Sequence, residues 1–271
     1  MTTSAIPNPV LGLLLHDVTD APETSGFLQP TAFRYQHSVD LFRRYLDVVE
    51  ASGLAVVTDP VRSSELSEDL HATVAITFDD GGTSAETAAG LLEERGWRGT
   101  FFVTTDLIGT NGFLTQSQLR DLDGRGHRIG SHSCSHPDVF RRLSRQTMRR
   151  EWCQSRDVLQ QLLGHAVTSA SVPGGDCDAA TIEEASSAGL TQVFTSEQLT
   201  KPWQYAGAVC FGRLMMLRTT RPETLQRWLK YPNPGILPER ALRFTKSGVK
   251  RLPGPFYLKM MQHRRALHER S

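Results

Sequence analysis

The sequence predicts an α/β fold in which strands alternate with helices, built either as a parallel barrel or as a doubly wound sheet. Short apolar segments typical of buried strands alternate along the chain with longer segments of helical character. The chain has 271 residues, of which 39% are hydrophobic and 22% charged. This composition fits one large domain with an ordinary core.

The individual elements follow from local signals. Three expected helix starts have capping-box form, with a threonine followed three residues later by Glu or Gln, at Thr83, Thr115 and Thr220. In chain order, we expect strand-like or helical segments at 10–16, 38–52, 54–58, 73–78, 84–95, 99–104, 116–124, 127–131, 144–163, 166–172, 178–189, 191–195, 208–217 and 221–230.

Two adjacent carboxylates end one of the expected strands, in the run 77–82 (TFDDGG). Successive side chains of a strand point to opposite faces, so Asp79 and Asp80 can share a site only if the chain turns there. Gly81 and Gly82 permit that turn. One acid can then bind a metal ion while the other transfers protons.

Two histidines follow about fifty residues later, in the run 131–136 (SHSCSH). His132 and His136 are four residues apart, so they lie on one side of a helical turn or tight loop and can meet a single ion. Two imidazoles and one carboxylate leave positions open for water and substrate, which is typical of a catalytic metal site. Either run alone could be a plain turn or a surface pair, and their combination is the more specific signal.

Together the two runs resemble motifs of the polysaccharide deacetylase family, also called the NodB homology domain or carbohydrate esterase family four. The first motif, T-F-D-D-G, stands unaltered at 77–81, and the second, H-S/T-x-x-H, stands at 132–136. The resemblance selects between the two architectures. It implies a distorted (β/α)7-like barrel of the glycoside hydrolase and deacetylase type over residues 1–235.

The resemblance also implies roles for the four residues. Asp79 is the general base, and Asp80, His132 and His136 bind a divalent ion, most often zinc. Such an ion lowers the pKa of its bound water and polarises an amide carbonyl, while a carboxylate beside it removes the proton. A metal-bound acid is a poor base, so Asp79 is the better candidate for that role.

The third family motif, R-x-P followed by an aromatic residue and Gly, is matched only in part by the run 171–175 (SVPGG). The arginine, which orients the base in the family, is missing. The backbone N–H after the proline helps to hold the oxyanion in the family, and here it belongs to Gly174. An N–H donor needs no particular side chain, so this role survives. Without the other motifs, Pro-Gly-Gly would be an ordinary strand-to-helix turn.

The fifth family motif, Leu-x-His, supplies the general acid, and the matching region 211–218 contains no histidine. We expect His16, at the end of the first apolar strand, to face the same end of the barrel as Asp79 and to serve as the acid. A partly buried histidine bonded to nearby backbone is the alternative. Arg213 and Arg218 could bind an anionic part of the substrate or lie solvated along the sheet rim.

The N-terminus has no basic region, and the apolar run 10–15 is too short for a signal peptide core or a membrane span. The four cysteines show no C-x-x-C spacing, which fits a reducing compartment. We therefore expect a cytoplasmic protein and an intracellular, biosynthetic substrate.

The balance of basic and acidic residues changes near the C-terminus. Residues 239–271 contain nine Lys or Arg against two Glu, whereas the preceding residues are acidic overall. A basic extension over 236–271 could contact an anionic membrane at the inner face, lie solvated, or pack over the barrel. No nucleic-acid-binding motif accompanies the charge, so we expect no nucleic acid partner.

These inferences lead to one main hypothesis. The protein is a metal-dependent hydrolase that removes an N-acetyl or similar small acyl group from an amino sugar, lipid-linked or nucleotide-linked, in glycan or polysaccharide biosynthesis. Two alternatives stay open: a catalytically impaired, metal-holding protein that binds sugar or regulates, and a hydrolase of a non-sugar C–N bond.

Overall fold

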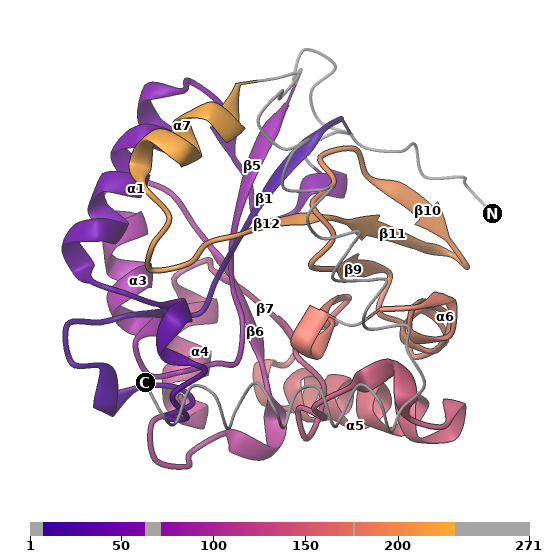
Figure 1. The fold of residues 1–271 in the computed structure, drawn as a ribbon. Coiled ribbons are helices and arrows are strands. Elements are labelled where there is room, and N and C mark those ends of the chain that lie inside the picture. The colour runs from indigo at the N-terminus through magenta and orange to yellow at the C-terminus, as the bar shows by residue number, and fades with distance from the viewer. Residues whose placement is uncertain (1–7, 63–71, 176, 231–271) are drawn as a thin grey trace, which may run out of the picture.

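The protein is a curved parallel sheet surrounded by helices, seen here in a computed structural model that describes residues 8–62, 72–175 and 177–230 (Figure 1). The main strands match the expected segments closely. They are β1 (Val10–Leu15), β5 (Thr73–Phe78), β6 (Thr100–Val103), β7 (Arg128–Ser131), β8 (Ser169–Ser171), β9 (Gln192–Phe194), β11 (Ala208–Phe211) and β12 (Arg213–Met215).

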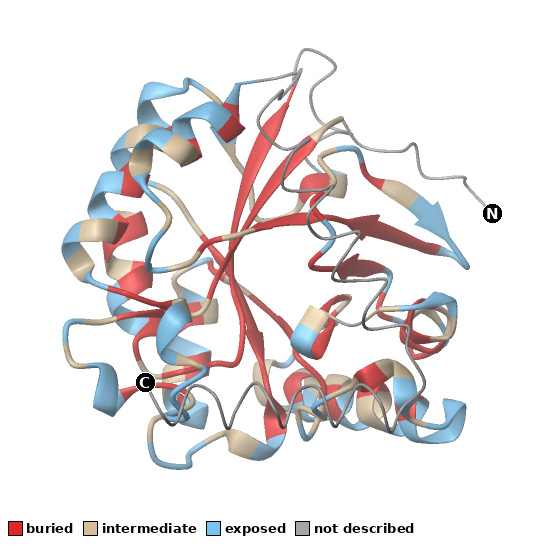
Figure 2. Ribbon diagram, in the orientation of Figure 1, coloured by how far each residue is buried: buried red, intermediate tan, exposed pale blue. Residues whose placement is uncertain are grey.

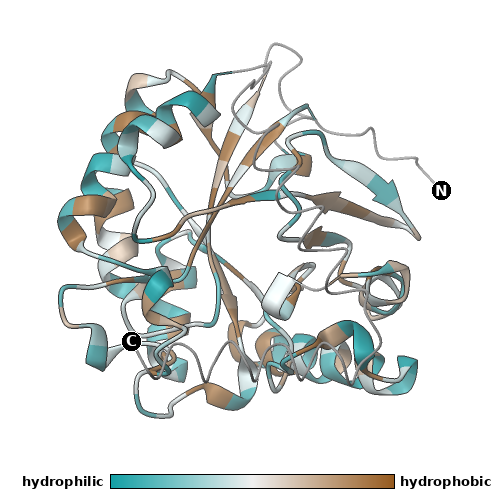
Figure 3. Cartoon of the chain, viewed as in Figure 1, coloured by the Kyte–Doolittle hydropathy of each residue, from teal (hydrophilic) through white to brown (hydrophobic). Residues whose placement is uncertain are grey.

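The long helices lie on the outside of the sheet, with exposed outer faces and buried inner faces (Figure 2). Helix α1 packs against α7, and α5 against α6. The helices are α1 (Val39–Ala51), α3 (Ala85–Glu93), α4 (Gln116–Gly124), α5 (Arg145–Leu163), α6 (Ala179–Ser187) and α7 (Pro222–Leu229). Hydrophilic residues concentrate on these helices and on the loops (Figure 3).

Shorter elements connect the main ones and were not expected from the sequence, apart from β4. Two residues of strand or three of helix carry too little periodicity to be recognised. The short strands are β2 (Asp17–Val18), β3 (Gln36–His37), β4 (Ala55–Val56) and β10 (Trp203–Tyr205). The 3-10 helices are η1 (Pro22–Thr24), η2 (Phe33–Tyr35), η3 (Thr105–Leu107), η4 (Phe140–Arg142) and η5 (Pro173–Gly175).

Only one of the three expected capping boxes forms. Thr115 caps α4, and Gln118 bonds back to it. The predictions for Thr83 and Thr220 were wrong because their hydroxyls have other partners: Thr83 donates to the Thr24 carbonyl, and the Thr220 hydroxyl accepts from the Leu217 N–H.

The sheet has the strand order β10-β11-β9-β8-β7-β6-β5-β1-β12, with β4 beside β5. All of these pairs are parallel except β10 with β11. The expected strand 208–217 divides at Gly212, so β11 pairs with β9 and β12 with β1. The chain therefore passes directly from β11, the strand next to one edge of the sheet, to β12 at the other edge, although hydrogen bonds between the described strands do not close the ring. This arrangement accounts for the distorted barrel.

The loop after β9 fills the junction at Gly212. Its Thr195 N–H donates to the carbonyl of Phe211, and its Glu197 carbonyl accepts from the N–H of Arg213. A side chain at position 212 would collide with the Glu197 carbonyl, so this crossing requires glycine.

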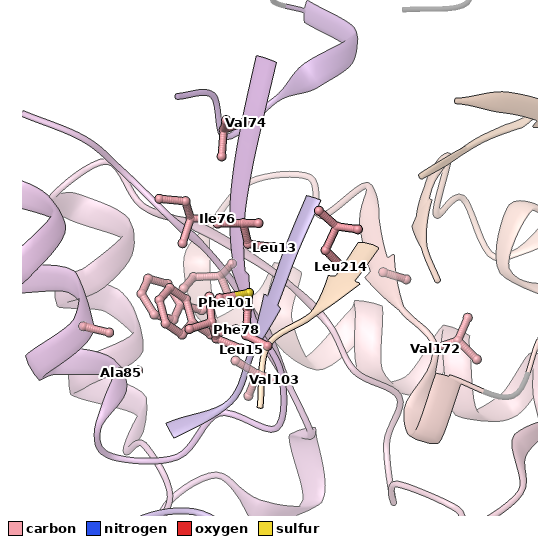
Figure 4. Close-up of a cluster of buried hydrophobic side chains, with 14 of the residues drawn as sticks. Leu13, Leu15, Val74, Ile76, Phe78, Ala85, Phe101, Val103, Val172 and Leu214 are labelled. Carbon is pink, nitrogen blue, oxygen red and sulfur yellow. The ribbon is translucent and has the colours of Figure 1, made fainter. Parts of the chain in front are cut away.

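Two apolar layers cover the two faces of the sheet. The larger lies between the strands and the helices and includes Leu13, Ile76 and Leu214 (Figure 4). In the same layer the rings of Phe78 and Phe101 stack with centroids 4.8 Å apart. The smaller layer fills the inside of the curved sheet with Val10, Ala75, Phe102, Phe194, Val209 and Phe211. Because strand side chains alternate between faces, Gly12, Leu14 and His16 follow Val10 on the inward face.

The main strands are parallel, so their carboxyl ends meet at one edge of the barrel. His16, Asp79, Thr104 and His132 each follow directly after a strand at that edge. Active sites of such barrels are built there. The basic extension expected over 236–271 lies outside the described residues.

Within the described part of the chain, no helix combines the length and the apolar character needed to span a membrane.

Candidate metal and catalytic site

Asp79 and Asp80 turn into the mouth of the barrel at the end of β5. Asp79 continues the pairing of β5 with β1, because its N–H donates to the carbonyl of Leu15. Asp80 then adopts a left-handed conformation with φ of 77°, followed by Gly81 at 87°. A non-glycine residue rarely takes this conformation, and such residues concentrate at functional sites. The turn buries both carboxylates at the same site.

His132 follows β7 directly, and His136 closes the loop after it. Ser133 and His136 both have positive φ, at 63° and 53°, so the loop is tightly wound. The Nδ1 atom of His132 lies 3.0 Å from the carbonyl oxygen of Ser171. A proton on Nδ1 donates to that carbonyl, which leaves the lone pair of Nε2 directed at a metal.

Asp80, His132 and His136 converge on one point. The Oδ1 atom of Asp80 lies 3.3 Å from Nε2 of His132 and 3.4 Å from Nε2 of His136. One ligand atom from each residue lies within 4.8 Å of the other two. Asp80 Oδ1 is buried and makes no hydrogen bond to the described residues. A buried oxygen in this state, faced by two imidazole nitrogens, fits a divalent ion such as zinc.

The charges of the trio also favour a cation. Burial would raise the pKa of Asp80, but the facing imidazoles of His132 and His136 hold this pKa well below its usual range. Burial would lower the pKa of His136, and Asp80 outweighs that effect and raises it. Asp80 is thus an ionised carboxylate in a buried position.

Asp79 is held by hydrogen bonds from an arginine that is 134 residues distant in the sequence. Nη1 of Arg213 donates to Oδ1 of Asp79 at 2.8 Å, and Nη2 donates to Oδ2 at 2.9 Å. Ser171 donates to Oδ2 at 3.0 Å and accepts from Nη2 of Arg213 at 2.7 Å. A bidentate guanidinium fixes both the position and the plane of a carboxylate.

Neither role considered for Arg213 was right. Its side chain is fully buried, so it is neither solvated at the rim nor available to an anionic substrate. It runs up the inside of the barrel and also donates to the Thr77 hydroxyl and the Thr195 carbonyl. Gly12 makes room for it, since a side chain at position 12 would lie 2.8 Å from Cγ of Arg213. Arg218, by contrast, is exposed.

The arginine keeps Asp79 ionised. Burial would raise the pKa of Asp79, but the charges of Arg213 and His132 and the hydrogen bonds from Arg213 bring it below its ordinary value. Asp79 therefore remains an anion at neutral pH. Its Oδ2 atom lies 4.0 Å from Nε2 of His132, which places Asp79 next to the candidate metal trio.

His16 lies beside Asp79 on the neighbouring strand. The register pairs Leu15 with Phe78, so the next residues of the two strands are adjacent. A positive charge on His16 would lower the pKa of both Asp79 and Asp80. The ring of His16 stacks on Tyr35 with centroids 4.6 Å apart, and its buried Nδ1 has no hydrogen-bond partner among the described residues.

Gly174 lies three residues after Ser171, which itself bonds Asp79. It is left-handed, with φ of 62° and ψ of 2°, so a glycine is favoured here. Pro173 before it is buried. The end of β8 thus brings the Gly174 backbone to the same edge as Asp79 and the trio of Asp80, His132 and His136.

Residues 68–193 match the family model described as polysaccharide deacetylase. This stretch, a little under half of the chain, is thus similar to polysaccharide deacetylases. The chain is 26% identical over 160 residues to YxkH of Bacillus subtilis, a match that covers 58% of this chain and 57% of YxkH. It is 29% identical over 137 residues to the peptidoglycan-N-acetylglucosamine deacetylase PgdA of Listeria monocytogenes, covering 50% of this chain and 28% of PgdA. The chain thus matches little more than half of the one relative and about a quarter of the other.

Solved structures confirm the fold class. The deacetylase PplD of Streptococcus pyogenes, solved in complex with acetate, superposes with a TM-score of 0.66 at 20% identity, over 83% of this chain and 99% of PplD. IcaB from Ammonifex degensii gives a TM-score of 0.66 at 21% identity, over 82% of this chain and 97% of IcaB. The deacetylase-type barrel expected from the motifs is therefore confirmed.

Proposed function

We propose that the protein is a metal-dependent hydrolase that removes an N-acetyl group from an amino sugar. The observation that carries this proposal is the convergence of Asp80, His132 and His136 beside Asp79, whose carboxylate is oriented by Arg213. The match of residues 68–193 to the polysaccharide deacetylase model supports the same reaction.

The residues divide the chemistry between them. A divalent ion, zinc in our proposal, would be held by Asp80, His132 and His136 and would supply Lewis acidity to the amide carbonyl and acidify a bound water. Asp79 accepts a proton from the attacking water, because it is ionised and both of its oxygens are fixed. The Gly174 N–H donates to the carbonyl oxygen as negative charge develops on it.

The reaction also requires a proton donor for the leaving nitrogen. We propose that His16 provides it, since it lies beside Asp79 at the carboxyl edge of the barrel. When the C–N bond breaks, the proton passes to nitrogen, and the products are acetate and a free amino sugar. General acid catalysis of this kind typically contributes about 10² to 10⁴ in rate.

Our proposed substrate is an N-acetylated sugar linked to a lipid or a nucleotide, used in glycan or polysaccharide biosynthesis in the cytoplasm. The name of PgdA describes an enzyme acting on N-acetylglucosamine of peptidoglycan, which supports the sugar class. The basic residues between 239 and 271 are the reason to include a lipid-linked substrate at an anionic membrane surface.

The impaired, sugar-binding alternative has lost one of its two supports. It rested on the absent arginine of the third motif and the absent histidine of the fifth. Arg213 now supplies a guanidinium to the base from another strand. The remaining question is the proton donor.

Metal analysis of the purified protein, combined with acetate release from a panel of substrates, tests the proposal. The panel contains nucleotide-linked sugars, lipid-linked sugars, N-acetylglucosamine oligomers and simple non-sugar amides. Asp79→Asn is the control variant, because it keeps the shape and removes the proton acceptor. We expect one ion per chain and acetate from a sugar substrate, and none with Asp79→Asn. Metal binding without acetate release from any substrate would favour the sugar-binding alternative, and release only from the simple amides would favour the non-sugar one.

A further inference from the structure

The loop that carries both histidine ligands is tightly wound and must be held in shape. Between His132 and His136 the backbone takes left-handed conformations at Ser133 and at His136 itself. These conformations cost free energy for non-glycine residues and persist only where the surroundings impose them. The contacts of the loop therefore determine whether the two imidazoles meet at one point.

One carboxylate from helix α5 holds the centre of this loop. Oε2 of Glu151 accepts hydrogen bonds from the consecutive N–H groups of Cys134 and Ser135, each at 2.9 Å. Its Oε1 accepts from the hydroxyl of Ser135 at 2.7 Å. Successive N–H groups that converge in this way form a small anion-binding concavity. Here the chain fills it with its own side chain.

A second residue of α5, one turn further on, holds the start of the loop. The hydroxyl of Ser155 lies 2.8 Å from that of Ser131, which accepts from the Ser133 N–H at 3.2 Å. The Ser133 hydroxyl in turn accepts from the N–H of His136 at 3.1 Å. All four N–H groups from 133 to 136 therefore bond side-chain oxygens, and Glu151 serves the middle two.

The loop carbonyls are held from the opposite side. The N–H of Thr105 donates to the Ser133 carbonyl at 3.3 Å, and the N–H of Asp106 donates to the Cys134 carbonyl at 3.0 Å. The loop is thus clamped between η3 and α5. On the α5 side, charge-assisted bonds to Glu151 are the strong ones.

We propose that Glu151 is a positioning residue for the metal site, acting through the backbone of 134–135 to keep His132 and His136 aimed at Asp80. The inference rests on the proposed metal site. Glu151 contacts the loop backbone and the Ser135 hydroxyl, and it is not one of the three proposed ligands. Its loss should weaken metal binding by allowing the loop to relax, while the chemistry of a metal-loaded site stays the same. Residues that orient metal ligands typically change metal affinity about 10- to 100-fold.

The test compares Glu151→Ala with Asp157→Ala by titrating metal-free full-length protein with zinc in the presence of a competing chelator. Asp157 is a matched control, because it lies on the same helix and its carboxylate pairs with Arg156. We expect zinc affinity to fall about 10- to 100-fold in Glu151→Ala and to stay within twofold in Asp157→Ala. Amide exchange at Cys134 and Ser135 should be faster in metal-free Glu151→Ala than in the wild type.

Two further measurements separate positioning from general stability. If Glu151→Ala does not fold, Glu151→Gln keeps the shape and an accepting oxygen but loses the charge, and it should bind zinc with intermediate affinity. Saturated with zinc, either variant should recover most of the wild-type kcat. Unchanged zinc affinity in a folded variant, with a lowered melting temperature alone, would overturn the inference. If the wild type binds no zinc, the metal site itself is refuted and this inference with it.

Discussion

Replacing Arg213 by methionine removes the support of Asp79 while leaving the three metal ligands in place. The guanidinium contacts Asp79, Ser171, Thr77 and the Thr195 carbonyl, and none of the metal ligands is among these partners. We therefore expect Arg213→Met to retain its metal and to lose turnover.

Burial sets the magnitude of the effect on stability. Arg213 is fully buried and Asp79 is 5% exposed, so the variant leaves an anion in the protein interior without its partner. Removing one partner of a buried ion pair costs about 3–5 kcal/mol. For a domain of this size, that loss lowers the melting temperature by roughly 6–20 °C. Since a badly oriented base contributes little, kcat should fall about 10²-fold or more.

The decisive assay is a double-mutant cycle with Asp79→Asn, measured by urea unfolding. In the Asp79→Asn background no buried anion is left without a partner. Arg213→Met should therefore lower the free energy of unfolding by at least about 1 kcal/mol less than it does in the wild type. Arg218→Met is the matched control, because Arg218 is exposed on the following segment, and it should change stability by less than about 0.5 kcal/mol. If Arg213→Met lowers the free energy of unfolding by amounts that agree within about 0.5 kcal/mol in the two backgrounds, the coupling between Arg213 and Asp79 is refuted.

Three further predictions concern other parts of the molecule. His132→Ala should abolish stoichiometric metal in the purified protein, and full occupancy by elemental analysis would contradict the site. His16→Gln should lower kcat by about 10² or more with metal content unchanged, because it removes the proton donor, and turnover within twofold of the wild type would exclude that role. Burial lowers the pKa of His37 from 6.5 to about 4, so the unfolded chain binds a proton there that the folded chain does not. The contribution of neutral His37 to the free energy of unfolding is fully present above pH 6.5, and it falls by about 3 kcal/mol as the pH drops to about 4. Unfolding of His37→Leu should accordingly depend less on pH across this window, and an unchanged dependence would falsify the assignment.

Much of the fold could be predicted because its signals are local. Strands such as 73–78 are continuous apolar runs, and all the long helices have the expected positions. The convergence of the candidate metal trio was equally accessible, since His132 and His136 share one loop and Asp80 follows a strand. The adjacency of His16 and Asp79 followed from the rule that parallel strands end at the same edge. None of these inferences required the register of one strand against another.

The partner of Asp79 could not be found in this way because it is 134 residues distant in sequence. Two signals pointed to it. Arg213 interrupts an otherwise apolar strand-like run, and Gly12 lies in the middle of the first strand, where a side chain would normally pack. Reading them together requires the register, which pairs Gly12 with Arg213 on β1 and β12. Register depends on the whole sheet and is absent from any single segment.

The site also explains how the family's third motif can lose its arginine. Ser171 stands where that motif has its arginine, and its small side chain bonds both Asp79 and Arg213. The base requires a guanidinium in a fixed plane, and this requirement does not specify the strand that supplies it. A serine on β8 and a glycine on β1 leave the space through which an arginine on β12 reaches the same carboxylate. The departure at position 171 is therefore matched by a buried charge elsewhere in the barrel, and the absence of the motif's arginine does not by itself indicate an inactive protein.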